Sequence, residues 1–397
     1  MKLQQAELPE PSADARAASA ALLRLIAAEI EAHGGWISFA RYMELALYAP
    51  GLGYYSGGSH KFGDHQAGGD FLTAPELTPL FGKTLARQVA QIIAASSPQV
   101  IEAGAGSGRL AADLLPALAA LDCLPERYRI LELSGELRAR QQATLAARAP
   151  QFAGCVEWLN ELPQGFSGCL IGNELLDAMP THALRWSDDG ETPAVFERGV
   201  GLTDGRPAVA ERPASGALLA AAQALGVQGP YRGEISLAAR SWVSELARRL
   251  EQGAMLLIDY GLPRHELYHA LREGGTLRCH YRHRVHEDPF WFPGLSDITS
   301  HVDFTAVAEA GFDAGLDVLG FTSQANFLLN CGIGDLLQED KVGAGDTTRA
   351  DDLRARGAVN VLISPNEMGE LFKVIALGRG IPGPLLGFAR ADRVHAL

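Results

Sequence analysis

The chain has few cysteines, no excess of basic residues and no long apolar run. Its five cysteines are widely and irregularly spaced without a Cys-x-x-Cys pair, which favours a reducing compartment. The formal net charge of -13 disfavours nucleic-acid binding, because a sequence-independent binder needs basic surface to displace counterions. No apolar run approaches the length that spans a bilayer. These absences predict a cytoplasmic, bacterial protein with no nucleic-acid partner and no membrane insertion.

Two familiar phosphate-binding motifs are also missing around the most informative stretch of the chain. A short apolar strand at 100–103 runs through Glu102 into three alternating glycines, Gly104, Gly106 and Gly108. A dinucleotide fingerprint needs glycine or alanine where Arg109 stands, and no Gly-Lys-Ser/Thr follows for a phosphate loop. Glu102 would also repel a pyrophosphate. The turn therefore predicts a nucleotide-like ligand without phosphate, bound by close backbone approach and a helix N-terminus.

A second acidic residue strengthens this interpretation. The strand pattern at 128–133 contains Glu132, followed by Leu133, a little over twenty residues beyond the glycines. That spacing is typical of an acid that contacts a ribose in such folds. The alternative is a tight structural turn in an α/β scaffold.

The residues before the glycines predict a helical lid. Residues 15–32 have the apolar period of an amphipathic helix, and Ser38 caps a second helix that continues through Leu47. A glycine- and histidine-rich loop covers 57–69, and Thr73, Pro75 and Glu76 follow it. We expect these three residues over the ligand, although a capping subdomain explains the segment equally well.

Further elements follow from apolar runs and periodicity. We expect strands at 168–172, 255–259, 315–321 and 371–377, and helices at 241–250, 304–310 and 324–337. The histidine tract at 280–286 has interleaved arginines and lacks nearby acids, so we expect a substrate-side or solvated loop and no metal site.

Seven motifs together resemble the MidA family of class I S-adenosylmethionine-dependent methyltransferases, whose mitochondrial members are arginine methyltransferases in respiratory complex I assembly. They lie in order along about residues 20–380, at 39–55, 69–76, 102–108, 173–180, 258–261, 275–278 and 297–304. The resemblance implies an α/β fold: a Rossmann-like, mostly parallel seven-stranded sheet with helices on both faces. It predicts a lid at 1–80, a catalytic domain at 81–380 with insertions near 184–235 and 262–302, and a tail at 381–397.

The resemblance also implies the ligand and the site. We expect S-adenosyl-L-methionine as cofactor. Its predicted contacts are Thr73, Pro75, Glu76, Glu102, Gly104, Gly106, Gly108, Glu132, Leu133, Asn173 and Glu174. Asp259 and Tyr260, at the end of a strand, are predicted to contact the methyl acceptor; the alternative is a buried aspartate that caps a neighbouring turn. The catalytic candidates are Glu174, Asp177 and His301, with Glu174 the strongest. The alternative for Glu174 is a polar contact to the cofactor.

Glu174 begins a Glu-Leu-Leu segment like that of symmetric arginine methyltransferases, in which two glutamates hold a guanidinium. Ala183 stands where the second glutamate is expected, so Asp177 or Glu197 would replace it, or the acceptor is not arginine. Three functions remain open: methylation of an NADH-quinone oxidoreductase subunit or similar protein, methylation of a small molecule, and non-catalytic binding of S-adenosylmethionine during assembly. A homodimer is a further expectation.

Overall fold

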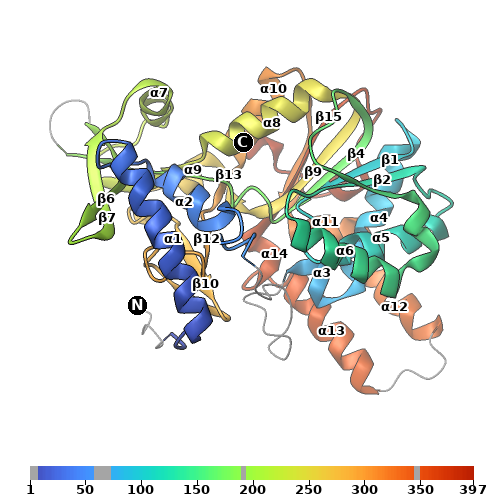
Figure 1. Ribbon diagram of the computed structural model, residues 1–397. Coiled ribbons are helices and arrows are strands. Elements are labelled where there is room, and N and C mark those ends of the chain that lie inside the picture. Colours follow the sequence, from blue (N-terminus) through green and yellow to red (C-terminus); the bar gives the residue numbers. More distant parts are fainter. Residues whose placement is uncertain (1–7, 58–72, 189–193, 344–348) are drawn as a thin grey trace. The chain divides into compact units, whose positions relative to one another are not determined.

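The computed structural model describes residues 8–57, 73–188, 194–343 and 349–397 (Figure 1). These residues divide into two compact units, each assembled from separate segments. The first unit draws on 1–71, 177–241 and 262–303, and the second on 72–176, 242–261 and 304–397. The glycine- and histidine-rich loop predicted at 57–69 lies almost wholly outside the described residues.

A mainly parallel sheet forms the centre of the second unit. Its strands follow the order β14-β15-β9-β4-β1-β2-β3, and β15 is antiparallel to both of its neighbours. The bounds are β1 Gln99–Ala103, β2 Arg127–Leu131, β3 Val156–Leu159, β4 Phe166–Asn173, β9 Leu250–Leu262, β14 Asp317–Ser323 and β15 Phe372–Arg379. This arrangement confirms the predicted class I methyltransferase fold.

Helices cover both faces of this sheet. Figure 1 shows α10 on one side and α4 with α5 on the other, which agrees with the contacts of α10 to β14 and β15 and of α4 to β4. The helices of this unit are α3 Ala74–Leu77, α4 Pro79–Ala94, α5 Arg109–Ala120, α6 Gly135–Arg148, most of α8 Leu237–Arg249, α10 Phe304–Asp313, α11 Gln324–Asn330, α12 Ile333–Gly343, α13 Arg349–Ile363 and α14 Met368–Leu371. Because both faces are covered, residues 254–258 of β9 are all buried, as expected of an inner strand.

The order of the strands locates a binding crevice. The chain builds β1, β2 and β3 outward in one direction, and β4 then returns to the other side of β1. Loops diverge at such a reversal, and ligands of open α/β sheets bind there, beyond the carboxyl ends of the strands. The glycine turn follows β1, and Asn173 ends β4. The fold therefore brings both predicted motifs to this edge.

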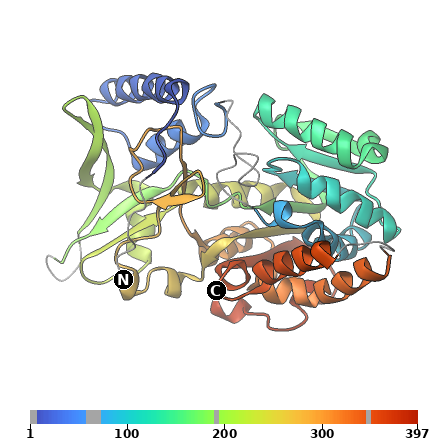
Figure 2. The same cartoon turned by 90° about the horizontal axis from the view of Figure 1, so that it is seen from below.

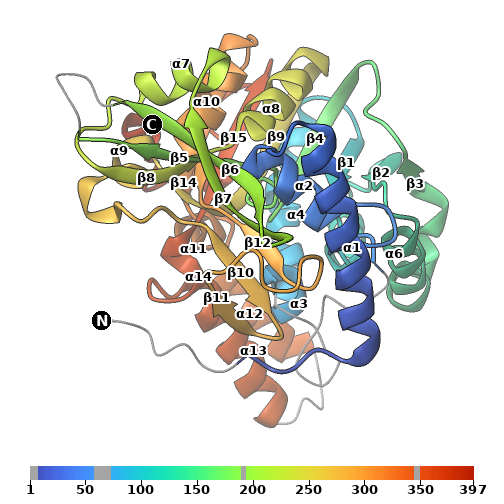
Figure 3. The same ribbon diagram turned by 60° about the vertical axis from the view of Figure 1, so that its left-hand side comes forward.

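The first unit contains two smaller sheets. One has the order β7-β6-β5-β8 and the other β11-β10-β12, all antiparallel. The strands of these sheets are β5 His182–Trp186, β6 Val195–Thr203, β7 Arg206–Pro213, β8 Tyr231–Ile235, β10 Arg278–Tyr281, β11 Arg284–His286 and β12 Asp297–Thr299. The two-residue strand β13 Val302–Asp303 belongs to neither sheet. The helices are α1 Ala13–Ala32, α2 Phe39–Tyr48, α7 Gly216–Ala224 and α9 Arg264–Leu267. Figure 3 shows α1 and α2 beside β6, which both helices contact.

The two predicted N-terminal helices are confirmed as α1 and α2. The Ser38 hydroxyl accepts a hydrogen bond from Arg41 N at 3.0 Å and so caps α2. Within the described residues, no helix is long and apolar enough to cross a membrane. The lid segment and the two insertions overlap with the first unit, and the division into domains stays a prediction.

The prediction of a loop at 280–286 is wrong, because these residues lie in the hairpin of β10 and β11. Cys279 and Tyr281 alternate with more exposed neighbours and point into the first unit, 0% and 5% exposed. Burial lowers the pKa of His280 to about 4, with smaller contributions from His286 and Arg278. In the described part of the chain, no group of three or more His, Cys, Asp or Glu side chains is arranged to hold a metal.

The helical stretch expected at 324–337 is confirmed, with a break that the sequence pattern did not predict. The chain forms α11 and α12, which are separated at Cys331 and Gly332. Gly332 has φ +80, a left-handed conformation that ends a helix and that glycine adopts without steric cost. Figure 2 shows the following pair, α12 and α13, side by side, as their contacts require.

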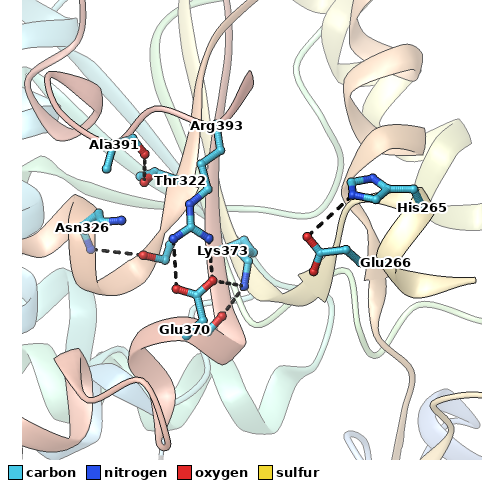
Figure 4. Close-up of polar contacts among 9 residues, drawn as sticks. His265, Glu266, Thr322, Asn326, Glu370, Lys373, Ala391 and Arg393 are labelled. Atoms are coloured by element: carbon cyan, nitrogen blue, oxygen red, sulfur yellow. Dashed lines mark hydrogen bonds and ion pairs between the residues drawn. The ribbon is translucent and has the colours of Figure 1, made fainter. Parts of the chain in front are cut away.

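Residues 381–397, predicted as a tail, pack against the second unit. The ring of Phe388 is 5% exposed and lies edge-on to Phe327, with the ring centres 5.5 Å apart. The Arg393 guanidinium donates to both oxygens of Glu370, at 2.6 and 3.2 Å, and Lys373 contacts the same carboxylate at 3.5 Å (Figure 4). The C-terminal segment therefore contributes Leu385 and Phe388 to the core of this unit.

Phe388→Ala should lower the free energy of unfolding by about 3–5 kcal/mol, the usual cost of removing a buried aromatic ring. Leu386→Ala, two residues away and 38% exposed, is the matched control and should cost about 1 kcal/mol or less. Chemical denaturation of the two variants measures the difference. Equal, small losses would show that the C-terminal residues contribute no core packing.

Candidate functional site

The glycine turn requires glycine at its alternating positions. Gly104, Gly106 and Gly108 have φ +70, +53 and +81, which side chains rarely adopt. Two of them also allow close packing: a Cβ on Gly104 would lie 2.8 Å from Leu175 Cδ1, and one on Gly108 would lie 2.9 Å from Gln141 Cα. The turn therefore joins β1 to α5 while touching the loop after β4 and helix α6. Gly108, the N-cap residue, has no side chain to cap α5, and the first helical N–H, that of Arg109, donates to Ser107 Oγ at 3.3 Å.

Glu102 is buried in the sheet beside the neighbouring strand. Its side chain is 3% exposed, and Tyr128 on β2 donates its hydroxyl hydrogen to Glu102 Oε2 at 2.6 Å. Burial raises the pKa of Glu102 to about 7, although the hydrogen bond from Tyr128 acts in the opposite direction. The carboxyl therefore gains its charge near neutral pH, and a nearby cation would favour the charged form. Contact between Glu102 and the cofactor stays a prediction.

Glu132 follows β2 directly, and both of its carboxylate oxygens accept hydrogen bonds. Ser134 N binds Glu132 Oε1 at 2.8 Å, and Gln141 Nε2 binds Oε2 at 2.9 Å. Burial raises the pKa of Glu132, and these hydrogen bonds oppose the shift. A carboxylate accepts about four hydrogen bonds, so both oxygens keep capacity for hydroxyl groups. The next residue, Leu133, is 79% exposed and offers an apolar surface to a flat ring.

The loop after β4 carries the strongest catalytic candidate. Glu174 has φ +51, a strained conformation for a non-glycine residue, and such residues cluster at functional sites. Its Oε1 accepts from Ala74 N and from Asn173 Nδ2, both at 3.3 Å. Asn173 Oδ1 is buried and receives no hydrogen bond from any described residue. A buried acceptor of this kind is suited to a ligand donor.

Asp259 holds this loop from the neighbouring strand. Asp259 Oδ2 accepts from Leu175 N at 3.0 Å and from Leu176 N at 2.8 Å, and Oδ1 accepts from Tyr260 N at 2.9 Å. The carboxylate is 1% exposed. The structure thus gives Asp259 a role in fixing the conformation after Glu174. Its predicted contact with the acceptor, like that of Tyr260, stays a prediction.

The short helix α3 and its flanking residues contact both the glycine turn and the loop after β4. Ser107 in the glycine turn donates to the Glu76 carboxylate, and Ala74 N donates to Glu174. Thr73 is the N-cap residue, and Pro75 occupies the first turn. The predicted residues Thr73, Pro75 and Glu76 therefore lie beside both motifs within the second unit. Their contact with the cofactor stays a prediction.

Three other candidates belong to the first unit. Asp177 is 5% exposed, and its carbonyl oxygen accepts from Ser300 N at 3.1 Å. His301 N donates to Thr276 Oγ1 at 3.1 Å. Glu197, considered as a second acid, contacts His182 Nδ1 at 2.6 Å. Their catalytic roles stay predictions.

Sequence reasoning missed Tyr128, Ser107, Gln141 and Trp158, which connect the predicted residues to one another. Tyr128 could have been found, because its strand pairs with the one that carries Glu102. Gln141 and Trp158 gave no sequence signal, since their partners are distant along the chain.

The second unit fits S-adenosyl-L-methionine on three observations. The left-handed glycines leave backbone open to the ligand, Asn173 Oδ1 is available to accept from the ammonium group, and Glu132 is fixed where a ribose diol would be bound. Leu133 is exposed beside Glu132, and its contact with the cofactor stays a prediction.

Comparisons with known proteins agree with this geometry. Residues 84–322 match a family described as S-adenosyl-L-methionine-dependent methyltransferases. A Burkholderia thailandensis protein crystallised with S-adenosyl-homocysteine is 52% identical, with a TM-score of 0.92, and the match covers 98% of this chain and 100% of that one. Protein arginine methyltransferase NDUFAF7 of Danio rerio is 28% identical, over 90% of this chain and 86% of the relative. The Drosophila melanogaster homologue is 27% identical, over 96% and 92%.

Glu102→Gln should stabilise the protein increasingly as the pH rises from 4.5 to above 7. The raised pKa means that the unfolded chain releases this proton at lower pH than the folded chain, so wild type loses stability over that interval. Glutamine resembles the protonated carboxyl and keeps an acceptor for Tyr128. We expect a gain on the order of 2 kcal/mol at pH 8 and almost none at pH 4, measured by denaturant titration.

Glu126→Gln removes an exposed carboxylate from the same unit and serves as the control for this pH series. Its effect should stay within about 0.5 kcal/mol at every pH. A pH-independent gain for Glu102→Gln would contradict the assignment of the raised pKa to this residue.

Proposed function

The chain belongs to the family of S-adenosyl-L-methionine-dependent methyltransferases, and we propose that it methylates arginine side chains of a protein substrate. The predicted methyltransferase activity and S-adenosyl-L-methionine cofactor are confirmed by the family match and by the similar structure with S-adenosyl-homocysteine. The relatives named as protein arginine methyltransferases support the finer proposal.

Different residues of the second unit would bind the cofactor and orient the methyl acceptor. The cofactor supplies an electrophilic methyl group on a sulfonium. The glycine turn and Asn173 would hold its amino acid portion, and Glu132 its ribose. Transfer then requires the acceptor nitrogen to be held in line with the methyl group and water to be excluded, rather than a covalent intermediate.

The observation that carries the proposal is the position and conformation of Glu174. Its carboxylate follows β4 at the ligand edge of the sheet, in a strained backbone conformation that Asp259 fixes from β9. An arginine side chain remains protonated at neutral pH, and a carboxylate can bind two of its N–H groups at once. Such an ion pair orients the planar guanidinium and polarises the nitrogen that accepts the methyl group. Glu174 is thus the proposed catalytic residue.

A second acid would hold the guanidinium together with Glu174. Ala183, at the position where a second glutamate is expected, is 6% exposed within β5 and pairs with Glu234 on β8. Asp177 and Glu197 remain the proposed alternatives. His301 remains a proposed residue for orienting the acceptor.

The proposed partner is a subunit of an NADH-quinone oxidoreductase or a similar protein in a bacterial cytoplasm. The resemblance to the MidA family supports this choice, and the net charge of -13 favours a substrate segment rich in arginine. A homodimer remains part of the proposal.

Methyl-labelled S-adenosylmethionine tests the acceptor directly. The purified protein is incubated with lysate from cells that lack it, and the protein fraction is hydrolysed for amino acid analysis. We expect label in methylarginine and none with heat-inactivated enzyme. Label in the small-molecule fraction or in another amino acid would reject arginine. Binding of the cofactor without any transfer would favour the non-catalytic assembly function.

Glu174→Gln should lower methyl transfer by about 100-fold or more, because it removes the charge that orients the guanidinium. It keeps an oxygen for the hydrogen bond from Ala74 N, so affinity for S-adenosyl-homocysteine should change by less than about threefold. Calorimetry and the label assay measure the two quantities.

Gly106→Val is the control for loss of cofactor binding. Valine is strained at φ +53, so this variant should not bind the cofactor. Equal loss of cofactor affinity in both variants would show that Glu174 serves binding rather than catalysis.

A further inference from the structure

A buried glutamine on α6 connects three parts of the cofactor site. Gln141 is 0% exposed. Its Nε2 donates to Gly106 O at 3.2 Å and to Glu132 Oε2 at 2.9 Å, and its Oε1 accepts from Trp158 Nε1 at 2.9 Å. One carboxamide thus contacts the glycine turn, the acid after β2 and an aromatic residue of β3.

The chemistry of these partners fixes the orientation of the amide. The indole N–H of Trp158 can only donate, so it must meet the glutamine oxygen. The Gly106 carbonyl and the Glu132 carboxylate can only accept, so both must meet the amide nitrogen. The two hydrogens of that nitrogen serve these two acceptors. In a flipped amide, the oxygen would face the two acceptors, Gly106 O and Glu132, and the nitrogen would face the indole N–H of Trp158.

Packing holds this side chain at a fixed distance from the turn. A Cβ on Gly108 would lie 2.9 Å from Gln141 Cα and 3.2 Å from its Cβ, so only glycine lets α6 approach so closely. Gln141 lies deep in the unit, and an unpaired polar group there would be destabilising, because it would have neither water nor a protein partner to bind.

We propose that Gln141 is a positioning residue of the cofactor site, which sets the orientation of the Glu132 carboxylate and ties it to the glycine turn. It acts through these two groups and need not touch the cofactor itself. The inference rests on the cofactor site and is independent of the proposed arginine substrate, because its test uses no methyl acceptor.

The test measures S-adenosyl-homocysteine binding by calorimetry in the full-length protein. Gln141→Met keeps the length of the side chain and removes all three hydrogen bonds, and we expect about a tenfold higher Kd, which is about 1.4 kcal/mol. The matched control is Gln142→Met, on the same helix but exposed, which should bind within about twofold of wild type.

A double-mutant cycle separates positioning from a general structural role. In a Glu132→Ala background, Gln141→Met should cost less than about threefold, because the group it positions is gone and only the Gly106 contact remains. A loss equal to that in wild type would overturn the proposal, as would a Kd for Gln141→Met within twofold of wild type.

A second variant keeps the test decisive where Gln141→Met fails to fold. Trp158→Phe leaves Gln141 in place and removes the donor that fixes the amide orientation. We expect about a threefold rise in Kd that disappears in the Glu132→Ala background. A rise that persists there, or no rise, would overturn the proposal.

Discussion

The close approach of backbone to backbone at the glycine turn is the constraint on which the rest of the site depends. Side chains are absent at Gly104 and Gly108, so Leu175 and the α6 helix pack directly against the turn. Added Cβ atoms would push apart the loop after β4 and the helix that carries Gln141. The turn therefore sets the distances between the residues that surround the ligand, as well as giving the ligand access to backbone.

Two buried carboxyl groups depend on this geometry in different ways. Glu102 has one strong donor, Tyr128, and burial raises its pKa to about 7. Glu132 has donors on both oxygens, and they oppose the effect of burial on its pKa. A site that binds a cationic sulfonium and ammonium offsets the cost of desolvating such groups, because each positive charge favours the ionised carboxyl. If Glu102 contacts the cofactor as predicted, cofactor binding would favour the ionised form of this carboxyl.

Local sequence patterns predicted the central helices and strands, because each of these is formed by residues close together in the sequence. The apolar run before Glu102, the period of 15–32 and the Ser38 cap all correspond to elements of the structure. The contacts of Gln141, Asp259 and Ser107 could not be predicted in this way, since their partners lie on other strands and helices. The irregular composition of 280–286 hid the alternation of a short hairpin, and the break at Gly332 depended on a single left-handed residue.

Asp259 shows that a residue which stabilises a binding loop can have the same position in the sequence as a residue that contacts the ligand. An acid at the end of a strand predicts contact with a ligand, and Asp259 has that position. Its oxygens accept three backbone N–H groups, two of them from the residues that directly follow Glu174, and its contact with the acceptor stays a prediction. Those bonds stabilise the loop that keeps Glu174 at φ +51, a conformation that would otherwise relax. The buried Asp259 carboxylate therefore maintains the strained backbone of Glu174, and the proposed catalytic geometry depends on β9 as much as on β4.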